Sequence, residues 1–383
     1  MEAFSQMMPH GDLPPVGRKI SLLQSSENLL EDILPYNKYW VDSGTSALAL
    51  ALLDAKAHFS DLPAPRAIIP GYCCPDLVAA CVFAGIEPVV VDVAFNDPSY
   101  NLDELSTQLD HRVVAVIAIN FLGIAERLEQ LRDLIIHKGL ATRLIEDNAQ
   151  WFPSSTNEMH FFSDYVTFSF GRGKPLSLLG GGLLLSRGSL SCAASQHIAS
   201  SQTSTALLKI KISAYNILLI PFFYMFLNRN PFLRLGETKY IPLQKIEALD
   251  AFRVSLLTSN FNSYSSCKTD LRQMYDDATD NLQQLLPLAS LRAARLLRYP
   301  LLCKDGEIRD KLLAYMRDEG LGASAMYCVA IDKVDGVGGL VTIASSLENA
   351  NSFACRFVTL PVNDSISKAL RKKLCGLFAA HNH

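Results

Sequence analysis

With 383 residues, of which 49% are hydrophobic, the chain is long enough to bury a large core, and we expect one large and one small domain. The formal net charge of -3 offers no basic stripe, which argues against a nucleic-acid partner. The nine cysteines are odd in number and contain no C-x-x-C pair, so they favour reduced thiols in a cytoplasmic protein over a disulfide framework or a zinc site.

The N-terminal twenty residues lack the basic start and apolar stretch that mark a signal peptide. Pro14, Pro15 and Gly17 indicate an extended arm instead. A helix is then expected to begin at the turn Ser43-Gly44-Thr45, because the following SALALALLDAKA repeats apolar residues at helical spacing. Free N–H groups and the helix dipole can bind phosphate there, although the same tripeptide is also a common helix cap.

Strand-like and helix-like segments alternate from residue 66 to residue 150. Near-continuous apolar strands separated by helices predict a mostly parallel sheet with helices on both faces, and therefore an α/β large domain. The expected strands are 67–70, 88–93, 113–120 and 141–150, and the expected helices begin near 75 and cover 101–110 and 125–138.

The segment Ala141–Gln150 reads as a short buried strand that ends in two carboxylates, Glu146 and Asp147. In an α/β sheet, ligands bind outside the carboxyl ends of the strands, where these acids are expected. Pyridoxal phosphate (PLP) requires an ionised carboxylate opposite its ring nitrogen, and Asp147 is the candidate for that role. The alternative is an ordinary helix cap or loop acid.

A lysine lies between the next two expected strands. The strand Tyr165–Phe170 leads into a glycine-rich turn that carries Lys174, and three consecutive glycines precede another apolar run. Desolvation on such a turn would lower the pKa of the amine and favour the neutral, nucleophilic form that a Schiff-base lysine needs, unless the lysine is an ordinary solvated loop residue. A nucleotide-binding P-loop is excluded, because Phe168 and Pro175 stand where its first glycine and its hydroxyl residue belong.

Residues 206–235 are the most apolar part of the chain. The run Ala214–Leu227 is too short to span a bilayer and is interrupted by Pro221. We expect a buried or dimer-interface helix pair that is kinked at the proline. The alternative is an interfacial segment that touches a membrane or a greasy substrate, since Lys209, Lys211, Arg229 and Arg234 flank the run.

The C-terminal part is expected to form a smaller α+β domain. Residues 297–302 and 357–361 are strand-like, and residues 308–319 are helical, with Gly320 as the stop. Tyr327 and Arg356 could face a cleft in this domain, but packing and surface roles are the simpler expectation.

Four blocks in order give the chain a family resemblance: SGTSALAL at 43–50, IPGYCCPDLVAACVFAGIEPVVVDV at 69–93, IEDNAQ at 145–150 and TFSFGRGKPLSLLGGG at 167–182. Through them the chain resembles the DegT-type sugar aminotransferases, a family of fold-type-I PLP-dependent enzymes. The resemblance implies a large PLP-binding domain over 1–265, with the N-terminal arm and an apolar helical insert at about 203–235, and a small C-terminal domain over 266–383. It also implies a homodimer with the active site at the interface.

The resemblance assigns roles to matching residues. Lys174 would form the Schiff base with PLP and Asp147 would pair with the pyridine nitrogen. Gln150, three residues further on, would bond the ring hydroxyl. No residue is expected to bind a metal.

The phosphate and the face of the ring are assigned in the same way. Ser169 would contact the phosphate together with Gly44 and Thr45. Tyr72 would lie over the ring, although Cys74 occupies a position that is often aromatic in relatives.

The implied function is transfer of an amino group from an amino acid, glutamate by resemblance, to a keto group. The acceptor is left open between a sugar-nucleotide-like and a hydrophobic compound, because residues 238–240 read Thr-Lys-Tyr where relatives have an Asn-Tyr-Arg element that reaches the partner subunit's cofactor phosphate. Another PLP-dependent reaction, such as C–C bond formation or elimination, and a non-catalytic PLP-binding or membrane-surface protein are the alternatives. The expected location is cytoplasmic, and peripheral membrane contact through 206–235 is the alternative to a buried or dimer-interface role of that segment.

Overall fold

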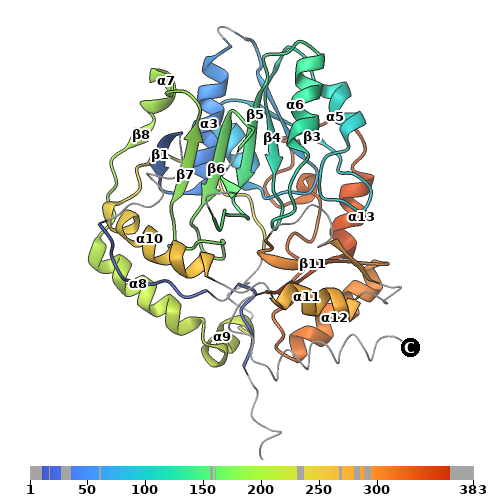
Figure 1. Ribbon diagram of the computed structural model, residues 1–383. Helices are drawn as coiled ribbons and strands as arrows, with labels where there is room; N and C mark the ends of the chain where they lie inside the picture. Colours follow the sequence, from blue (N-terminus) through green and yellow to red (C-terminus); the bar gives the residue numbers. More distant parts are fainter. Residues whose placement is uncertain are drawn as a thin grey trace, which may run out of the picture.

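Two main sheets organise the computed structural model of the chain (Figure 1). The large sheet has eight strands in the order β1-β7-β6-β5-β4-β2-β3-β12, and the small one has three in the order β10-β11-β13. The structure describes residues 11–16, 18–26, 36–59, 62–155, 158–159, 161–230, 237–266, 270–279, 285–288 and 295–362.

The large sheet is mostly parallel, as the alternating pattern predicts. All neighbouring strands from β12 to β6 pair in parallel, whereas β7 is antiparallel to both β6 and β1. The central strands are buried on both faces, which explains why they read as continuous apolar runs. The strands are β1 Asn37–Val41, β2 Arg66–Pro70, β3 Glu87–Val91, β4 Val113–Ile119, β5 Arg143–Asn148, β6 Tyr165–Ser169, β7 Gly182–Ser186 and β12 Thr342–Ile343.

Helices cover both faces of this sheet, as Figure 1 shows. Side chains alternate along each strand, so Ala115 and Ile117 of β4 join the core under α3 and α4. Val116 and Ala118 join a second core under α5 and α6. The helices are α3 Gly44–Ala57, α4 Asp76–Phe83, α5 Leu102–Gln108, α6 Leu128–His137, α7 Cys192–Ser195, α8 Thr205–Leu218, α9 Pro221–Asn228, α10 Ala251–Ser265, α11 Asp270–Thr279, α12 Gly306–Asp318 and α13 Glu348–Arg356.

The C-terminal part contains the expected small α+β unit. Its antiparallel sheet comprises β10 Leu285–Pro287, β11 Arg298–Cys303 and β13 Phe357–Pro361. Helix α12 shares an apolar core with β11 and β13 and is followed by Gly320 in the left-handed region, with φ +67, which is the helix stop that the sequence predicts.

The chain returns to the large unit before it ends. Strand β12 pairs with β3, and α13 packs on the large core through Ala350 and Phe353. The division at residues 265 and 266 remains a prediction, but part of the chain beyond it contributes to the large sheet. The two-stranded pairing of β8 Ile198–Ala199 with β9 Ile246–Glu247 and the short 3-10 helix Ile331–Lys333 complete the described elements.

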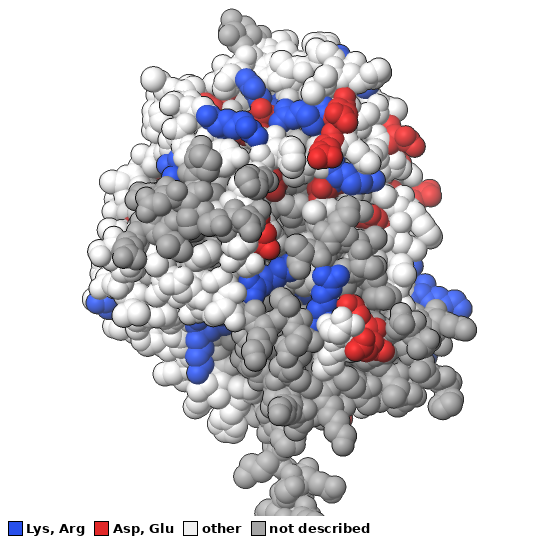
Figure 2. Space-filling model, viewed as in Figure 1, with Lys and Arg blue, Asp and Glu red and all other residues white. Residues whose placement is uncertain are grey.

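The apolar segment, as far as residue 230, forms the expected kinked pair of helices, and its last residues, 231–235, with Arg234, lie outside the described residues. Pro221 begins α9, and α8 and α9 enclose a bend of 95°. The pair is not buried within this chain, because Ile210 on α8 is 65% exposed and Phe226 on α9 is 60% exposed. On the face drawn in Figure 2, charges of both signs are interspersed in the upper half, and the area over α8 and α10 is mostly uncharged.

Among the described residues, no single helix is long and apolar enough to cross a membrane. Only α8 and α9 taken together meet such a test of length and composition. The sharp bend between them means that they do not form one straight span.

The N-terminal arm runs in an extended form over its own chain where the structure describes it. The N–H of Asp12 donates to Pro221 O at 3.1 Å, and the N–H of Leu13 donates to Gly320 O at 2.8 Å. The buried carboxylate of Asp12 pairs with Arg229 at 2.9 Å. The arm therefore links α9 to the small unit.

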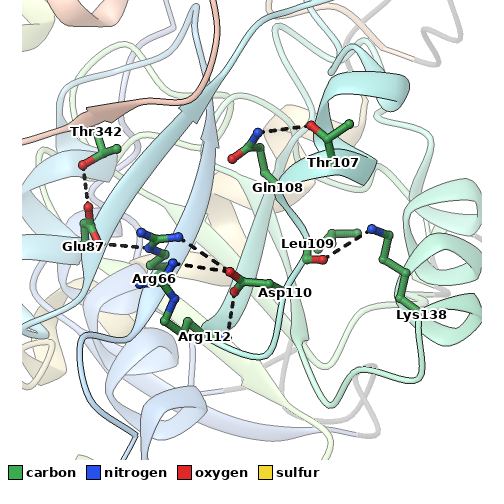
Figure 3. A network of polar contacts seen from close by, with 9 residues as sticks. All are labelled: Arg66, Glu87, Thr107, Gln108, Leu109, Asp110, Arg112, Lys138 and Thr342. Carbon is green, nitrogen blue, oxygen red and sulfur yellow. Dashed lines mark hydrogen bonds and ion pairs between the residues drawn. The ribbon is translucent and has the colours of Figure 1, made fainter.

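Ion pairs stabilise the edge of the large sheet at which the parallel strands begin (Figure 3). Arg66 at the start of β2 pairs with Glu87 at the start of β3 at 3.1 Å, and with Asp110 at 3.7 Å. Hydrogen bonds from Thr342 and Arg66 lower the pKa of the Glu87 carboxyl. Because parallel strands share one direction, this network lies at the edge opposite to their carboxyl ends.

Candidate active site

A cavity of about 210 Å³ lies at the carboxyl ends of the parallel strands. The end of β5, the end of β6, the start of α3 and the turn before β7 form its walls, so four segments that are distant in sequence meet there. This is the position at which ligands bind in open α/β sheets. The lining residues are Ser43, Gly44, Thr45, Leu48, Cys73, Cys74, Asp76, Leu77, Ile119, Phe121, Asp147, Ala149, Gln150, Ser169, Gly171, Lys174 and Tyr327.

Lys174 lies on the turn between β6 and β7 and is half-buried. Its backbone N–H donates to Gly171 O at 3.3 Å, and Gly173 has φ +74, which a residue with a side chain rarely adopts. The glycines thus allow the tight turn that brings the lysine to the cavity wall. Its amine is the only basic group among the described residues that line this cavity.

Asp147 lies on β5, one residue from its end, and is 6% exposed. Its Oδ1 accepts hydrogen bonds from the N–H of Ala149 at 2.9 Å and from the hydroxyl of Thr167 at 3.4 Å. Burial raises the pKa of the carboxyl, while the Ala149 N–H and the charge of Lys174 act in the opposite direction. No arginine or lysine within the described residues forms an ion pair with it, so a cationic ligand group would complement this carboxylate.

Glu146, the other carboxylate of the predicted pair, does not line the cavity. Alternation along β5 turns it to the other face, where Asn120 and Asn148 donate to its Oε1 at 3.0 and 2.9 Å. Burial raises its pKa, and these amides partly offset the effect. The two adjacent acids therefore have different environments, and only Asp147 can meet a ligand in this cavity.

The start of α3 forms the other end of the cavity. Ser43 caps the helix by accepting from the N–H of Ser46 at 3.0 Å, and Gly44 and Thr45 begin the first turn. Unpaired N–H groups and the helix dipole favour an anion at such a position. Ser169, at the end of β6, packs against this turn and lines the same cavity, and its contact with a phosphate, which the resemblance implies, stays a prediction.

Glycine at position 44 is required by this close packing. A Cβ there would lie 2.6 Å from the Cβ of Ser169 and 2.9 Å from its hydroxyl oxygen. We expect Gly44→Ala to shift the start of α3 and to weaken the binding of PLP, the cofactor that the resemblance implies, roughly tenfold. Absorbance titration with PLP measures the effect.

Gly188 offers the matched control for this substitution. It is exposed, and a Cβ added to it would meet nothing within 4 Å. Gly188→Ala should leave PLP affinity unchanged. Equal PLP affinities of Gly44→Ala and Gly188→Ala would show that the start of α3 does not contribute to PLP binding.

Gln150 is hydrogen-bonded to Tyr327, a residue of the C-terminal part that packs in the large core. Its Oε1 accepts from the N–H of Leu122 at 3.0 Å, and its Nε2 donates to the hydroxyl of Tyr327 at 3.1 Å. Gln150 is therefore held in place by two hydrogen bonds and lines the cavity, as expected. Tyr327, which the sequence analysis left without a site role, lines the same cavity, whereas Arg356 does not.

Tyr72 is the expected site residue that the structure does not bring to the cavity wall. It is 1% exposed, its hydroxyl donates to Tyr327 O at 3.0 Å, and its ring packs on Phe353 with centroids 4.9 Å apart. The ring is thus part of the core between the large sheet and α13. Stacking on a ligand in the cavity is not supported for Tyr72.

Cys73 and Cys74, which follow Tyr72, line the cavity in its place, together with Phe121. Burial raises the pKa of Cys74 to about 12 and that of Cys73 well above its usual range. Both thiols are therefore protonated near neutral pH and are poor nucleophiles. They are wall residues rather than reactive groups, and no disulfide joins any cysteines in the described segments.

The cavity fits the demands of PLP in three respects: a helix start whose free N–H groups suit an anion, a buried carboxylate that forms no ion pair among the described residues, and a lysine amine on the wall. A mostly parallel sheet with this site at its carboxyl edge and a small antiparallel unit beside it is the architecture of the fold-type-I PLP-dependent enzymes. The predicted fold class is thereby confirmed.

The family comparison agrees with the sequence blocks. Residues 38–199 match the model of the DegT/DnrJ/EryC1/StrS aminotransferase family, which confirms the predicted resemblance over this part of the chain. A GDP-perosamine synthase from Vibrio cholerae is 28% identical over 148 residues, which are 38% of this chain and 39% of that protein. The chain thus matches about two fifths of the length of this relative.

Solved structures resemble the chain over nearly its whole length. A sugar aminotransferase, Spr1654 of Streptococcus pneumoniae in its PLP form, gives a TM-score of 0.69 at 16% identity and covers 96% of this chain and 98% of that one. The GDP-4-keto-6-deoxy-D-mannose-3-dehydratase of E coli gives 0.70 at 13% identity, with coverages of 96% and 99%. At these identities the likeness establishes the fold alone.

Proposed function

We propose that the protein is a PLP-dependent aminotransferase that moves an amino group from an amino acid, glutamate by resemblance, to a keto group of a sugar-nucleotide-like or hydrophobic acceptor. The observation that carries the proposal is the meeting of Lys174, Asp147 and the start of α3 in one cavity. The family match over residues 38–199 supports it.

When bound, PLP supplies an aromatic ring that withdraws electrons from the carbon that carries the amino group. The residues of this chain would hold the cofactor and move the protons that this chemistry requires. Lys174 would hold the cofactor covalently and, once released by the incoming amine, take up and return a proton at its Nζ. Asp147 would keep a proton on the ring nitrogen, because its buried carboxylate needs a cationic partner.

The remaining wall residues position the cofactor. The N–H groups at the start of α3 and the hydroxyl of Ser169 would bind its phosphate. The side-chain amide of Gln150 would bond the ring hydroxyl. Phe121 and the protonated thiols of Cys73 and Cys74 would exclude water from the walls.

The experiment that tests this function is an absorbance spectrum of the purified protein with PLP, before and after L-glutamate is added. We expect a visible band that disappears with glutamate, and the product 2-oxoglutarate in equal amount. A visible band that glutamate and other amino acids leave unchanged would favour a different PLP reaction, or a protein that binds PLP without turnover.

We also propose a homodimer with the active site at the interface, as the resemblance implies. Within the described residues, the phosphate end of the cavity is lined by hydroxyl groups and N–H groups but by no arginine. A phosphate dianion favours a further cation, which a second copy of the chain could provide. Sedimentation of the holoenzyme as a monomer at micromolar concentration would contradict this proposal.

The third proposal is that a cytoplasmic enzyme touches a membrane surface through α8 and α9. Support comes from exposed apolar side chains that include Ile210, Phe222 and Phe226, and from the exposed Lys209 and Lys211 among them. An apolar face edged by cations suits an anionic bilayer surface.

Vesicle sedimentation tests the membrane contact. We expect binding to vesicles that contain phosphatidylserine, weakened by at least roughly 10²-fold in the double variant Phe222→Ser with Phe226→Ser, because each buried phenyl ring contributes about 1.5–3 kcal/mol. The control Phe95→Ser removes a ring that is even more exposed, at 74%, from another part of the surface. Absence of vesicle binding by the unmodified protein would refute the contact.

A further inference from the structure

A second cavity, of about 340 Å³, lies beside the first. The two share Gln150, Lys174 and Tyr327 as lining residues, so the second cavity adjoins the lysine amine. Its other walls come from the N-terminal arm, α8, α9 and the small unit. A group bound there would lie next to the proposed reaction centre.

Most of the second cavity is apolar. Leu218 and Leu219 at the end of α8, together with Leu227 of α9, form one wall. The rings of Tyr215 and Tyr224 extend it, and Pro14, Pro15 and Val16 of the arm also line the cavity. The leucine and proline side chains of this wall favour an apolar ligand body over a bare sugar, because they offer no hydrogen-bond partner to hydroxyl groups.

One buried cation interrupts this apolar surface. Arg298, at the start of β11, lines the cavity and is 4% exposed. Its Nη2 donates to Gly322 O at 3.1 Å and to Thr359 O at 3.4 Å, and its Nη1 lies 3.6 Å from the sulfur of Met326. Its Nε has no hydrogen-bond partner, and no carboxylate among the described residues forms an ion pair with it.

A buried guanidinium without an anion is costly. Desolvation lowers the pKa of Arg298 to about 10, and the hydroxyls of Tyr224 and Tyr275 act in the opposite direction. A buried charge without a counter-ion destabilises the fold, and an anionic ligand would offset this cost through charge-assisted hydrogen bonds. Exposed Arg172, two residues before Lys174, lines the same cavity and adds a second cation.

We propose that the second cavity binds the keto acceptor, and that this acceptor carries an anionic group, a carboxylate or a phosphate, on an apolar body. Arg298 binds the anionic group, and the wall of α8 and α9 packs on the apolar body. The assignment to the acceptor rests on the proposed function. The preference for an apolar anion rests on the cavity alone.

Calorimetry with simple probes tests the preference on the PLP-loaded protein. The probes are octanoate, octyl phosphate and 1-octanol, which share one apolar body and differ in the head group. We expect the better of the two anions to bind at least tenfold more tightly than octanol, and its identity distinguishes a carboxylate from a phosphate. Equal binding of all three would overturn the proposal without any variant.

Substitutions then test the residue. Arg298→Met should lower the affinity for the better anion to that for octanol, and Arg298→Lys, which keeps the charge, should retain part of the preference. The control Arg317→Met removes an exposed arginine of α12 and should change nothing. Undiminished anion binding by Arg298→Met contradicts the role of Arg298. If that variant does not fold, the comparison of Arg298→Lys with the unmodified protein decides.

A separate readout keeps this inference apart from the proposed function. The visible absorbance band that depends on Lys174 is recorded in the same samples. A normal band without an anion preference overturns the inference and leaves the proposed function standing. If the protein prefers the anions but forms no such band, the second cavity is still a site for an apolar anion. The proposal that this anion is the keto acceptor is then overturned.

Discussion

Lys174→Ala is expected to remove the visible absorbance band with PLP and to reduce multiple turnover at least 10²-fold, within the range of roughly 10²–10⁴ that is typical of groups that move a proton. The reason is local. No other lysine or arginine within the described residues lines the first cavity, so no neighbouring amine can take over both the covalent attachment and the proton transfer.

The control for this substitution is Lys304→Ala, which removes an exposed lysine far from the cavity in sequence. It should leave the spectrum and the turnover unchanged. The thermal midpoint of Lys174→Ala should stay close to that of the unmodified protein, since the side chain of Lys174 makes no hydrogen bond or ion pair with any residue that the structure describes. Unchanged turnover in Lys174→Ala would refute the central assignment.

Asp147→Asn is the second substitution with a large expected effect. The amide fills the same space and can still accept from the N–H of Ala149, so the fold should persist. It cannot balance a proton on the ring nitrogen, and we expect turnover to fall roughly 10²–10⁴-fold with PLP still bound. Single-turnover kinetics with glutamate measures the loss directly.

Glu146→Gln is the matched comparison for Asp147→Asn. The neighbouring carboxylate faces away from the cavity and accepts from Asn120 and Asn148. Its substitution should lower the thermal midpoint without a comparable loss in turnover. A mild effect of Asp147→Asn, similar to that of Glu146→Gln, would mean that another group protonates the ring.

The sequence predicts much of the large sheet and of the lysine turn, because both depend on local pattern. Apolar runs of strand length, separated by helices at regular intervals, suffice for a parallel sheet. The glycines around Lys174 and the acid at the end of β5 then lie at the carboxyl edge by topology alone. The placement of these residues needed no knowledge of distant contacts.

Tyr72 and Tyr327 illustrate what local pattern cannot provide. Tyr72 follows a strand end, but α13 and Phe353 from the far end of the chain cover its ring. Tyr327 reaches the cavity from the loop between α12 and the 3-10 helix Ile331–Lys333, where nothing in its sequence neighbourhood marks a site. Which side chain faces the cavity is decided by the return of the C-terminal part to the large unit.

The apolar insert is a second case in which local pattern predicts the elements but not their contacts. Its composition predicts helices and the break at Pro221, but composition does not decide which face is covered. One face of α8 and α9 lines the second cavity, and the other is exposed. The role of Arg298 could not be predicted either. A single arginine in a strand-like run does not show whether a carboxylate will pair with it in the folded chain.

Borohydride reduction tests directly whether Lys174 is the lysine that binds PLP covalently. The PLP-loaded protein is reduced with borohydride, which fixes a lysine–PLP bond, and is then digested and analysed by mass spectrometry. We expect a single modified peptide with the added mass on Lys174, and none in Lys174→Ala. Modification of another lysine, or an equal spread over exposed lysines such as Lys211 and Lys304, would contradict it.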